Sequence, residues 1–304
     1  MQNHMDPERE FPLVLGTAQL GMPYGIRNKD GQPDQERAND IIMEAWERGI
    51  RQFDTAQGYG VSEDVLGKSL DRLGYSEEAL VISKFDPNLD HLDAKAMAHA
   101  LNRSVERLRV PALLGMMLHR EDMLSLWNDG LGDILKGFVA SGKVMHAGVS
   151  LYSPQKALDA LSIEDIHMLQ VPANILDRRF EKAGVFDVAD EKKKKVYLRS
   201  VFLQGLILMT GEEIPPRMEF ARPVIEQIEA LAHQMGLERD ELALAYVRQK
   251  MLRAFVIFGA ESPEQVRRSI ECWEKNVQRD IVSPIEKRFT DVDRVIVRPD
   301  LWPQ

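Results

Sequence analysis

Four polar residues close apolar segments of this sequence, and a tyrosine follows the first of them closely. Asp54, Lys84, His119 and Ser150 stand at the ends of four candidate strands, and Tyr59 lies in the turn after Asp54. A buried strand has little reason to end on an unpaired polar group, because burying such a group costs free energy. The spacing therefore indicates that these side chains converge on one site.

Proton and hydride transfer is the chemistry that this set of side chains suits. A tyrosine hydroxyl has an ordinary pKa near 10, and a neighbouring ammonium such as that of Lys84 is expected to lower it. Asp54 would keep the lysine charged, while His119 would bind a substrate oxygen and help to relay the proton. A carbon bonded to that oxygen could accept a hydride. The residues supply no hydride, so we expect the site to bind a cofactor that does.

Each of these residues also has an ordinary structural interpretation. Asp54 could cap a turn, Lys84 could be an exposed lysine, His119 could join a salt bridge, and Tyr59 could be a loop aromatic. Two other chemistries are also open. Lys84 could form a Schiff base as in an aldolase, and His119 could bind a metal with Glu121 or Asp122, although no second histidine lies nearby.

Short apolar segments that alternate with helical patterns must position these groups. Most are apolar throughout, as is typical of parallel strands covered on both faces. Ser153-Pro154 and Ser262-Pro263 predict helix starts, Gln265 predicts a capping box with Ser262, and Gly236 predicts a helix end. The expected strands are Leu13–Thr17, Ile50–Asp54, Leu80–Lys84, Leu113–His119, Met145–Ser150, His167–Val171, Val196–Ser200 and Ala254–Phe258.

Eight such strands in 304 residues predict an α/β fold, a single-domain (β/α)8 TIM barrel. We expect it to span residues 11–283, with a C-terminal tail at 284–304. The competing fold, an open doubly wound sheet, would carry a G-x-G-x-x-G motif after its first strand, and Leu15–Gly21 lacks that spacing. In a barrel, reactive groups belong at the C-terminal ends of the strands, which is where the polar residues stand.

The amino-acid composition excludes several classes of binding partner. Lys plus Arg is 39 and Asp plus Glu is 48, a formal charge of −9, which argues against bulk affinity for nucleic acid or anionic membranes. The one cysteine, Cys272, excludes an intramolecular disulfide and a cysteine metal cluster, and we expect no metal. No run reaches the roughly 18 apolar residues of a membrane span, and the N-terminus is polar and lacks the apolar core of a signal peptide. We therefore expect a cytoplasmic protein with a small-molecule partner.

Several segments together resemble those of one family, the aldo-keto reductases. The segment Phe53–Glu63, followed by Leu66-Gly67, resembles the family signature, while Ser83-Lys84 and Leu118-His119 match its later catalytic segments. Gly16–Gly25 is similar to a bacterial branch of the family. The resemblance implies an oxidoreductase on a (β/α)8 barrel that uses NADP(H), with NAD(H) as the alternative cofactor. Its substrate would be an aldehyde or ketone, reduced to an alcohol.

The resemblance also implies roles for individual residues. Tyr59 would donate the proton, Lys84 and Asp54 would tune it, and His119 would orient the carbonyl. A non-catalytic NADPH sensor or regulatory subunit on the same barrel is the alternative. Met22, Tyr24 and Trp127 are the expected substrate contacts. The cofactor would be held by Gly16, Thr17, Asp54, Ser150, Gln170, Arg199, Ser200, Leu203, Gly205, Gly259, Ser262, Gln265, Arg268 and Ser269.

The sequence departs from the family pattern in three places. Arg199 replaces the aromatic residue that stacks on nicotinamide, and its charge should favour the reduced, neutral ring over the oxidised, cationic one. Leu151 follows Ser150 where an amide is common. Gly259 and Gln265 stand where basic residues often hold the adenosine phosphate, so we expect Arg267 or Arg268 to replace them. The sequence names neither the substrate nor the oligomeric state.

Overall fold

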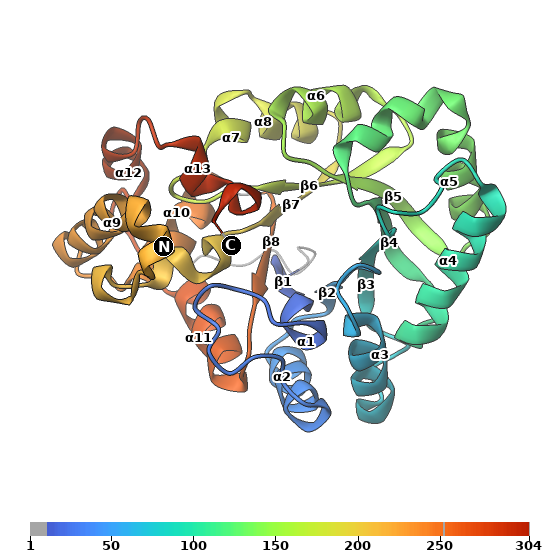
Figure 1. Cartoon of the computed structure of the whole chain (residues 1–304), viewed down its shortest axis with the longest axis horizontal. Coiled ribbons are helices and arrows are strands. Elements are labelled where there is room, and N and C mark those ends of the chain that lie inside the picture. Colours follow the sequence, from blue (N-terminus) through green and yellow to red (C-terminus); the bar gives the residue numbers. More distant parts are fainter. Residues whose placement is uncertain (1–10, 252, 304) are drawn as a thin grey trace.

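The computed structural model describes residues 11–251 and 253–303. Within these residues, eight parallel strands close into a barrel in chain order, with β8 paired to β1 (Figure 1). Every strand boundary lies within two residues of its predicted position, which confirms the (β/α)8 barrel. The strands are β1 Leu13–Gly16, β2 Gln52–Asp54, β3 Leu80–Lys84, β4 Leu113–Leu118, β5 Val144–Ser150, β6 Ile166–Pro172, β7 Lys195–Arg199 and β8 Phe255–Gly259.

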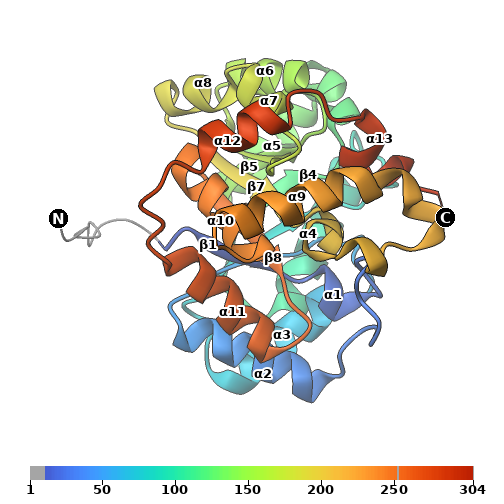
Figure 2. The same ribbon diagram turned by 90° about the vertical axis from the view of Figure 1, so that its left-hand side faces the viewer.

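Helices surround this barrel and bury their apolar faces against it. In Figures 1 and 2, α9 lies farther from the barrel than α10 does. No helix in the described part of the chain has both the length and the apolar character that a membrane crossing requires. The helices are α1 Ala18–Gly21, α2 Gln35–Glu47, α3 Ser62–Leu73, α4 Ala94–Leu108, α5 Leu131–Ala140, α6 Pro154–Ser162, α7 Arg179–Lys182, α8 Val185–Glu191, α9 Arg222–Gln234, α10 Arg239–Lys250, α11 Pro263–Glu274, α12 Val282–Arg288 and α13 Arg294–Val297.

Short 3-10 helices lie in the loops between these elements. They are η1 Glu121–Asp129, η2 Leu203–Leu208, η3 Gly211–Glu213, η4 Pro216–Ala221 and η5 Pro299–Leu301.

The barrel interior is packed solid. Met117 and Met168 are both fully buried there, and a Cβ on Gly115 would come within 2.6 Å of the sulfur of Met168. The hydroxyl of Tyr197 donates a hydrogen bond of 3.0 Å to Gln52 across the interior. Because the lumen holds no free space at this level, a functional site must lie at the strand ends.

The predicted capping box at the start of α11 is wrong by one residue. Ser262 does cap the helix, because its Oγ accepts a hydrogen bond of 3.3 Å from the backbone N–H of Gln265. The side chain of Gln265 accepts from the backbone N–H of Glu261 at 2.8 Å rather than from Ser262. The chain enters α11 in a conformation that presents the Glu261 amide instead. At the end of α9, Gly236 has a φ of +60°, as its predicted place at a helix end requires.

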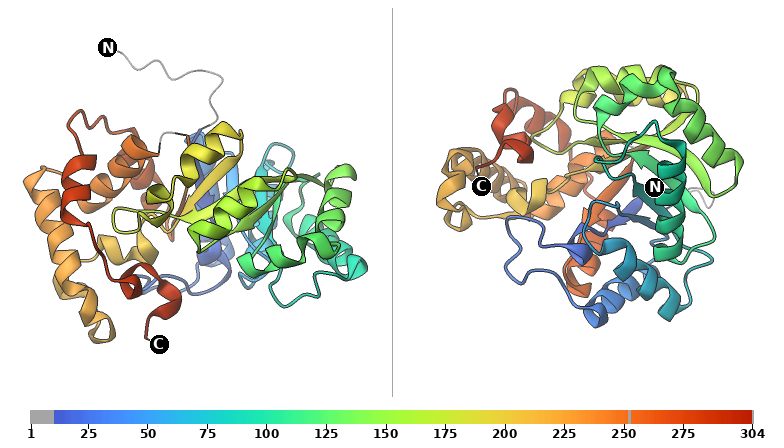
Figure 3. Two further views of the ribbon diagram at one scale, coloured as in Figure 1. Left: turned by 90° about the horizontal axis from the view of Figure 1, so that it is seen from above. Right: turned by 45° about the vertical axis from the view of Figure 1, so that its right-hand side comes forward.

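The C-terminal segment, residues 284–303, is folded against the barrel rather than loose. Trp302 is only 6% exposed, and its Nε1 donates to the carbonyl of Val295 at 2.9 Å. Arg217 donates to the carbonyl of Pro303 at 2.8 Å. Figure 3 shows the segment in red, running beside α9. The boundary predicted at residues 283/284 falls inside α12 and divides one helix.

Candidate active site

A buried ion pair lies at the C-terminal ends of β2 and β3. The Nζ of Lys84, which is 0% exposed, donates at 2.8 Å to each carboxylate oxygen of Asp54. It also donates to the carbonyl of Thr55 at 2.9 Å. Gln170, from β6 across the barrel, donates to Asp54 at 2.7 Å. All three lysine protons thus have acceptors, which a buried ammonium requires.

Tyr59 and His119 lie next to this pair. The Nζ of Lys84 is 4.9 Å from the centre of the Tyr59 ring, and the His119 ring meets that of Tyr59 edge to face, with centroids 5.6 Å apart. The Nδ1 atom of His119 is buried and has no hydrogen-bond partner among the described residues. The structure therefore brings together all four residues that the sequence singled out for catalysis.

Close backbone packing fixes the turn that carries Tyr59. A Cβ on Gly21 of α1 would lie 2.0 Å from the carbonyl oxygen of Tyr59, so only glycine fits there. The backbone N–H of Val61 donates to the carbonyl of Gly21 at 3.2 Å, and that of Ser62 donates to Tyr59 at 3.0 Å. The tyrosine is thus held between α1 and the start of α3.

The charge states differ from the expectation that Lys84 lowers the pKa of Tyr59. Burial raises the pKa of Tyr59 above its ordinary value of 10.0, and the Asp54 carboxylate raises it further. The expectation was wrong because it left out burial and the negative partner of the lysine. Burial, with Lys84 and Arg199, also lowers the pKa of His119 to about 3. At neutral pH the site holds a protonated phenol and a neutral imidazole.

A cavity of about 700 Å³ begins at these residues and extends outward to the first turns of α11. Its inner end is formed by Asp54, Tyr59 and Gln170, and Tyr24 also lines it. Lys84, which is fully buried, and His119, which is partly exposed, are not part of this lining. The predicted cofactor residues in the lining are Gly16, Thr17, Asp54, Gln170, Arg199, Ser200, Gly205, Gly259, Gln265, Arg268 and Ser269.

Five predicted contacts lie outside this lining. Ser150 ends β5 and is 3% exposed, Leu203 is buried in the core, and Ser262 caps α11. Met22 lies beside Gly60, where a Cβ would come 3.6 Å from its own. Trp127 packs against the start of α5, since a Cβ on Gly132 there would come within 2.8 Å of its ring.

The turn after β7 is strained and is joined to the loop after α1. Ser200, Leu203 and Gln204 have φ angles of +61°, +49° and +55°, a conformation that side chains other than glycine rarely adopt. The carbonyl of Gln204 accepts a hydrogen bond of 3.1 Å from the backbone N–H of Ile26.

That contact holds the loop against the cavity, where Arg27 and Lys29 line the wall. The sequence analysis missed both residues. Their position just after the first strand could have indicated them, because loops at this end of a barrel surround its mouth.

Opposite charges balance at the outer end of the cavity. Arg268 donates to Asp240 at 2.7 and 2.8 Å and also pairs with Glu241 at 3.3 Å. Arg267 instead pairs with Glu44 at 3.1 Å and does not line the cavity that the described residues form. Of the two predicted arginines, the structure therefore places only Arg268 at the cavity.

Cys272 lies one helical turn after Arg268 on α11 and contacts Asp240. Burial and the Asp240 carboxylate raise the pKa of its thiol to about 12, and the residue is 2% exposed.

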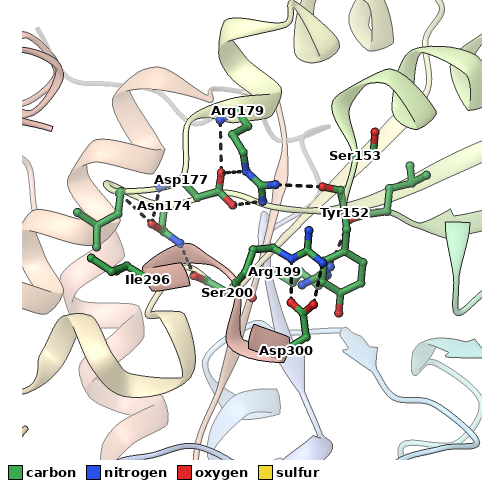
Figure 4. Close-up of polar contacts among 12 residues, drawn as sticks. Tyr152, Ser153, Asn174, Asp177, Arg179, Arg199, Ser200, Ile296 and Asp300 are labelled. Carbon is green, nitrogen blue, oxygen red and sulfur yellow. Dashed lines mark hydrogen bonds and ion pairs between the residues drawn. The ribbon is translucent and has the colours of Figure 1, made fainter. Parts of the chain in front are cut away.

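Arg199 rests on an aromatic ring that the sequence analysis did not single out. Its guanidinium carbon lies 4.0 Å from the centre of the Tyr152 ring, and it donates to the carbonyl of Leu151 at 3.2 Å. Figure 4 shows Arg199 and Tyr152 side by side. Tyr24 lies near the same charge, and burial raises its pKa to about 12, with a further contribution from Tyr59.

The acidic residues after β4 have other partners. A carboxylate oxygen of Glu121 accepts from the backbone N–H groups of Tyr152 and Ser153 at 2.7 and 2.8 Å, and Asp122 pairs with Arg120. Across residues 11–251 and 253–303, no group of three or more His, Cys, Asp or Glu side chains is placed to hold a metal ion. The geometry therefore does not support the metal site considered for His119.

The chain is similar in sequence and in structure to several known proteins. The chain is 24% identical to the aldo-keto reductase YhdN of Bacillus subtilis, over 86% of this chain and 87% of that one. It is 25% identical to a Schizosaccharomyces pombe relative named for a voltage-gated potassium channel β subunit, over 79% and 80% of the two chains. A Klebsiella pneumoniae aldo-keto reductase solved in complex with NADPH superposes with a TM-score of 0.72, at 19% identity over 93% and 92%.

The family comparison covers nearly the whole barrel. The model of the aldo/keto reductase family matches residues 12–288, from the residue before β1 to the last residue of α12. This match confirms the predicted family and the predicted enzyme class, an NAD(P)H-dependent oxidoreductase. By sequence and by fold, the chain belongs to the aldo/keto reductase family.

Proposed function

We propose that this protein reduces an aldehyde or a ketone to the alcohol with NADPH, with NADH as the alternative cofactor. One observation carries the proposal. A protonated phenol, Tyr59, lines the inner end of the cavity, and a neutral imidazole, His119, meets its ring edge to face, next to the buried Lys84–Asp54 pair. The unpartnered Nδ1 of His119 is a polar atom that a bound ligand could satisfy.

The cavity residues suit a dinucleotide with phosphate groups. Gly16 and Gly259 line the wall where a side chain would not fit, since a Cβ on Gly259 would lie 2.1 Å from the Gln19 side chain and a Cβ on Gly16 would lie 2.9 Å from that of Ile257. Arg27, Lys29 and Arg268 supply positive charge toward the outer end, where the first turn of α11 also favours an anion. Gln170 and Arg199 would hold the nicotinamide, and Gln265, Arg268 and Ser269 the adenosine phosphate. The Klebsiella relative of known structure binds NADPH, which supports the same cofactor here.

The side chains divide the proton chemistry among them. Bound NADPH supplies the hydride. Tyr59 donates its hydroxyl proton to the carbonyl oxygen, and the ammonium of Lys84 stabilises the phenolate that remains. Asp54 keeps Lys84 charged and fixed by two hydrogen bonds. His119, being neutral, orients the carbonyl as a hydrogen-bond donor, so it takes no part as an imidazolium.

A panel of aldehydes, ketones and sugars, assayed with NADPH and NADH side by side, tests the proposal. We expect NADPH oxidation with at least one carbonyl class. In the Tyr59→Phe variant, turnover should fall by about 10² to 10⁴, the usual contribution of a general acid. NADPH affinity should stay within about twofold of wild type, because only the proton donor is removed. Turnover retained in Tyr59→Phe would contradict the assigned role.

A sensor or regulatory subunit is the second candidate, and the Schizosaccharomyces pombe relative named for a channel β subunit favours it. Under this alternative the wild-type protein would bind NADPH but oxidise it with no carbonyl in the panel. The presence of all four residues in one site is the argument against it.

A further inference from the structure

The C-terminal segment reaches back to the ring on which Arg199 rests. Arg298, between α13 and η5, has its guanidinium carbon 5.1 Å from the centre of the Tyr152 ring. Asp300 accepts from Arg298 twice, at 2.8 and 2.7 Å. Figure 4 shows Asp300 directly beside Arg199 and Tyr152. Two guanidinium groups from distant parts of the chain therefore share one aromatic ring.

Tyr152 is a fixed support for both arginines. Its backbone N–H donates to Glu121 at 2.7 Å, and its carbonyl accepts from Arg179 at 3.2 Å. Arg179 in turn donates to the buried carboxylate of Asp177 at 2.8 and 2.7 Å. Because an arginine stacked on an aromatic ring takes its orientation from that ring, the position of Arg199 depends on this framework.

The positive charges beside the Tyr152 ring are only partly neutralised by acidic side chains. Asp300 neutralises Arg298 and also faces Arg199, and the two arginines, Arg298 foremost, lower the pKa of the Asp300 carboxyl. Glu121 is the other acid that faces Arg298. Arg199 itself forms no ion pair with any side chain in the described ranges. A change of charge on Arg298 or Asp300 therefore changes the electrostatic potential at Arg199, because no acidic side chain among the described residues pairs with Arg199 to offset it.

We propose that Arg298 and Asp300 are positioning residues that act on the cofactor through Tyr152 and Arg199. The charge of this pair sets how strongly the site prefers the reduced, neutral nicotinamide over the oxidised, cationic one. The inference rests on the proposed function, in which Arg199 holds the nicotinamide.

Two substitutions in the pair shift this preference in opposite directions. Asp300→Asn removes a negative charge, so the oxidised cofactor binds less well relative to the reduced one. Arg298→Gln removes a positive charge and leaves Asp300 facing Arg199, so the oxidised cofactor gains. The side chain of Asp300 is 44% exposed, and solvent screens such charges, so we expect each change to be about twofold to fivefold.

Titration of the full-length protein with NADPH and with NADP⁺ measures the ratio of the two dissociation constants. Asp300→Asn should raise the ratio of the NADP⁺ constant to the NADPH constant, and Arg298→Gln should lower it. Arg298→Lys keeps the charge and should keep the ratio near the wild-type value. The double variant should also return toward wild type, since it removes one charge of each sign. Added salt should shrink every difference.

A purely structural role would give a different result. Both dissociation constants would then rise together in both single variants, and an unchanged ratio would overturn the inference. Arg217→Gln is the matched control, because Arg217 also fixes the C-terminal segment, through the carbonyl of Pro303, but lies outside the Tyr152 cluster. Its ratio should equal that of wild type. If wild-type protein bound neither form of the cofactor, the proposed function itself would fail, which the first titration shows separately.

Discussion

The two ends of the cavity are built in different ways. At the inner end, the reacting side chains stand on or next to strand ends, and Lys84 has three acceptors and no exposure. At the outer end, the lining comes from loops and from the first turns of α10 and α11, and Arg268 binds both Asp240 and Glu241. The inner end is therefore fixed by the sheet, whereas the outer end depends on charges that a ligand would have to displace or join.

This difference separates chemistry from recognition. Strand ends in a closed barrel cannot move independently, so they suit groups that must keep a set distance. Loops such as the one that carries Arg27 and Lys29 can change without disturbing the barrel. Substitutions at the inner end should therefore alter turnover and stability strongly, and those at the outer end should alter affinity modestly.

The largest effect is expected for Lys84→Met. It leaves the Asp54 carboxylate buried without a cation, and the free energy of unfolding should fall by about 3–5 kcal/mol. Turnover should also be lost, because no charge remains to stabilise the phenolate. Denaturant titration and an NADPH oxidation assay measure the two effects.

The double variant Asp54→Asn/Lys84→Met separates them. It removes both charges, so it should regain most of the stability and none of the activity. If the double variant were no more stable than Lys84→Met, the buried pair would not be the cause of the loss.

His119 should make stability depend on pH. Its folded pKa is about 3, below the ordinary value of 6.5, so between these values the unfolded chain binds a proton that the folded chain does not. Stability therefore falls as the pH drops through this window, by at most about 1.4 kcal/mol per pH unit, and is fully present above it. Comparing unfolding free energies of wild type and His119→Gln from pH 4 to pH 8 isolates this contribution.

The activity profile gives a second reading of the same histidine. Because His119 stays neutral down to low pH, we expect the kcat/KM of the wild-type protein to show no step near pH 6.5 that belongs to this histidine. The profiles of wild type and His119→Gln should therefore have the same shape in that range. A step there that disappears in the variant would mean that the imidazole is charged in the working enzyme.

At the outer end, Arg268→Gln should weaken NADPH binding about threefold to tenfold and leave NADH binding nearly unchanged. The expected loss is limited because Asp240 and Glu241 already offset part of the charge of Arg268. Arg267→Gln is the control, since Arg267 pairs with Glu44 away from the cavity. An equal loss of affinity for NADPH and NADH would show that Arg268 does not bind the adenosine phosphate.

The smallest effect is expected at Trp127. Its ring packs against Gly132, so Trp127→Phe should change the KM of any carbonyl substrate by less than about twofold. Tyr24→Phe, which alters a residue that lines the cavity, should change KM more. A reversed order would restore the sequence-based assignment of Trp127 to the substrate.

The barrel and its inner end were predictable from sequence for a physical reason. Apolar runs of strand length and the polar residues that end them are local patterns, and a barrel brings all its strand ends to one face. The pKa of Tyr59 was not predictable, because desolvation depends on what tertiary packing places around the ring. The contact of Arg298 with Tyr152 was also not predictable from sequence. It joins two segments that are far apart in the chain, and neither segment has a repeating pattern that would indicate its place in the fold.

The rate at which a thiol reagent labels Cys272 can measure local opening of this protein. Cys272 is the one cysteine of the chain, it is 2% exposed, and its pKa of about 12 keeps it in the unreactive thiol form. A thiol reagent can therefore modify it only when α11 opens. Because Cys272 lies one helical turn after Arg268 on α11, cofactor bound at the outer end should slow that labelling, and the rate reports how often this end of the cavity opens in solution.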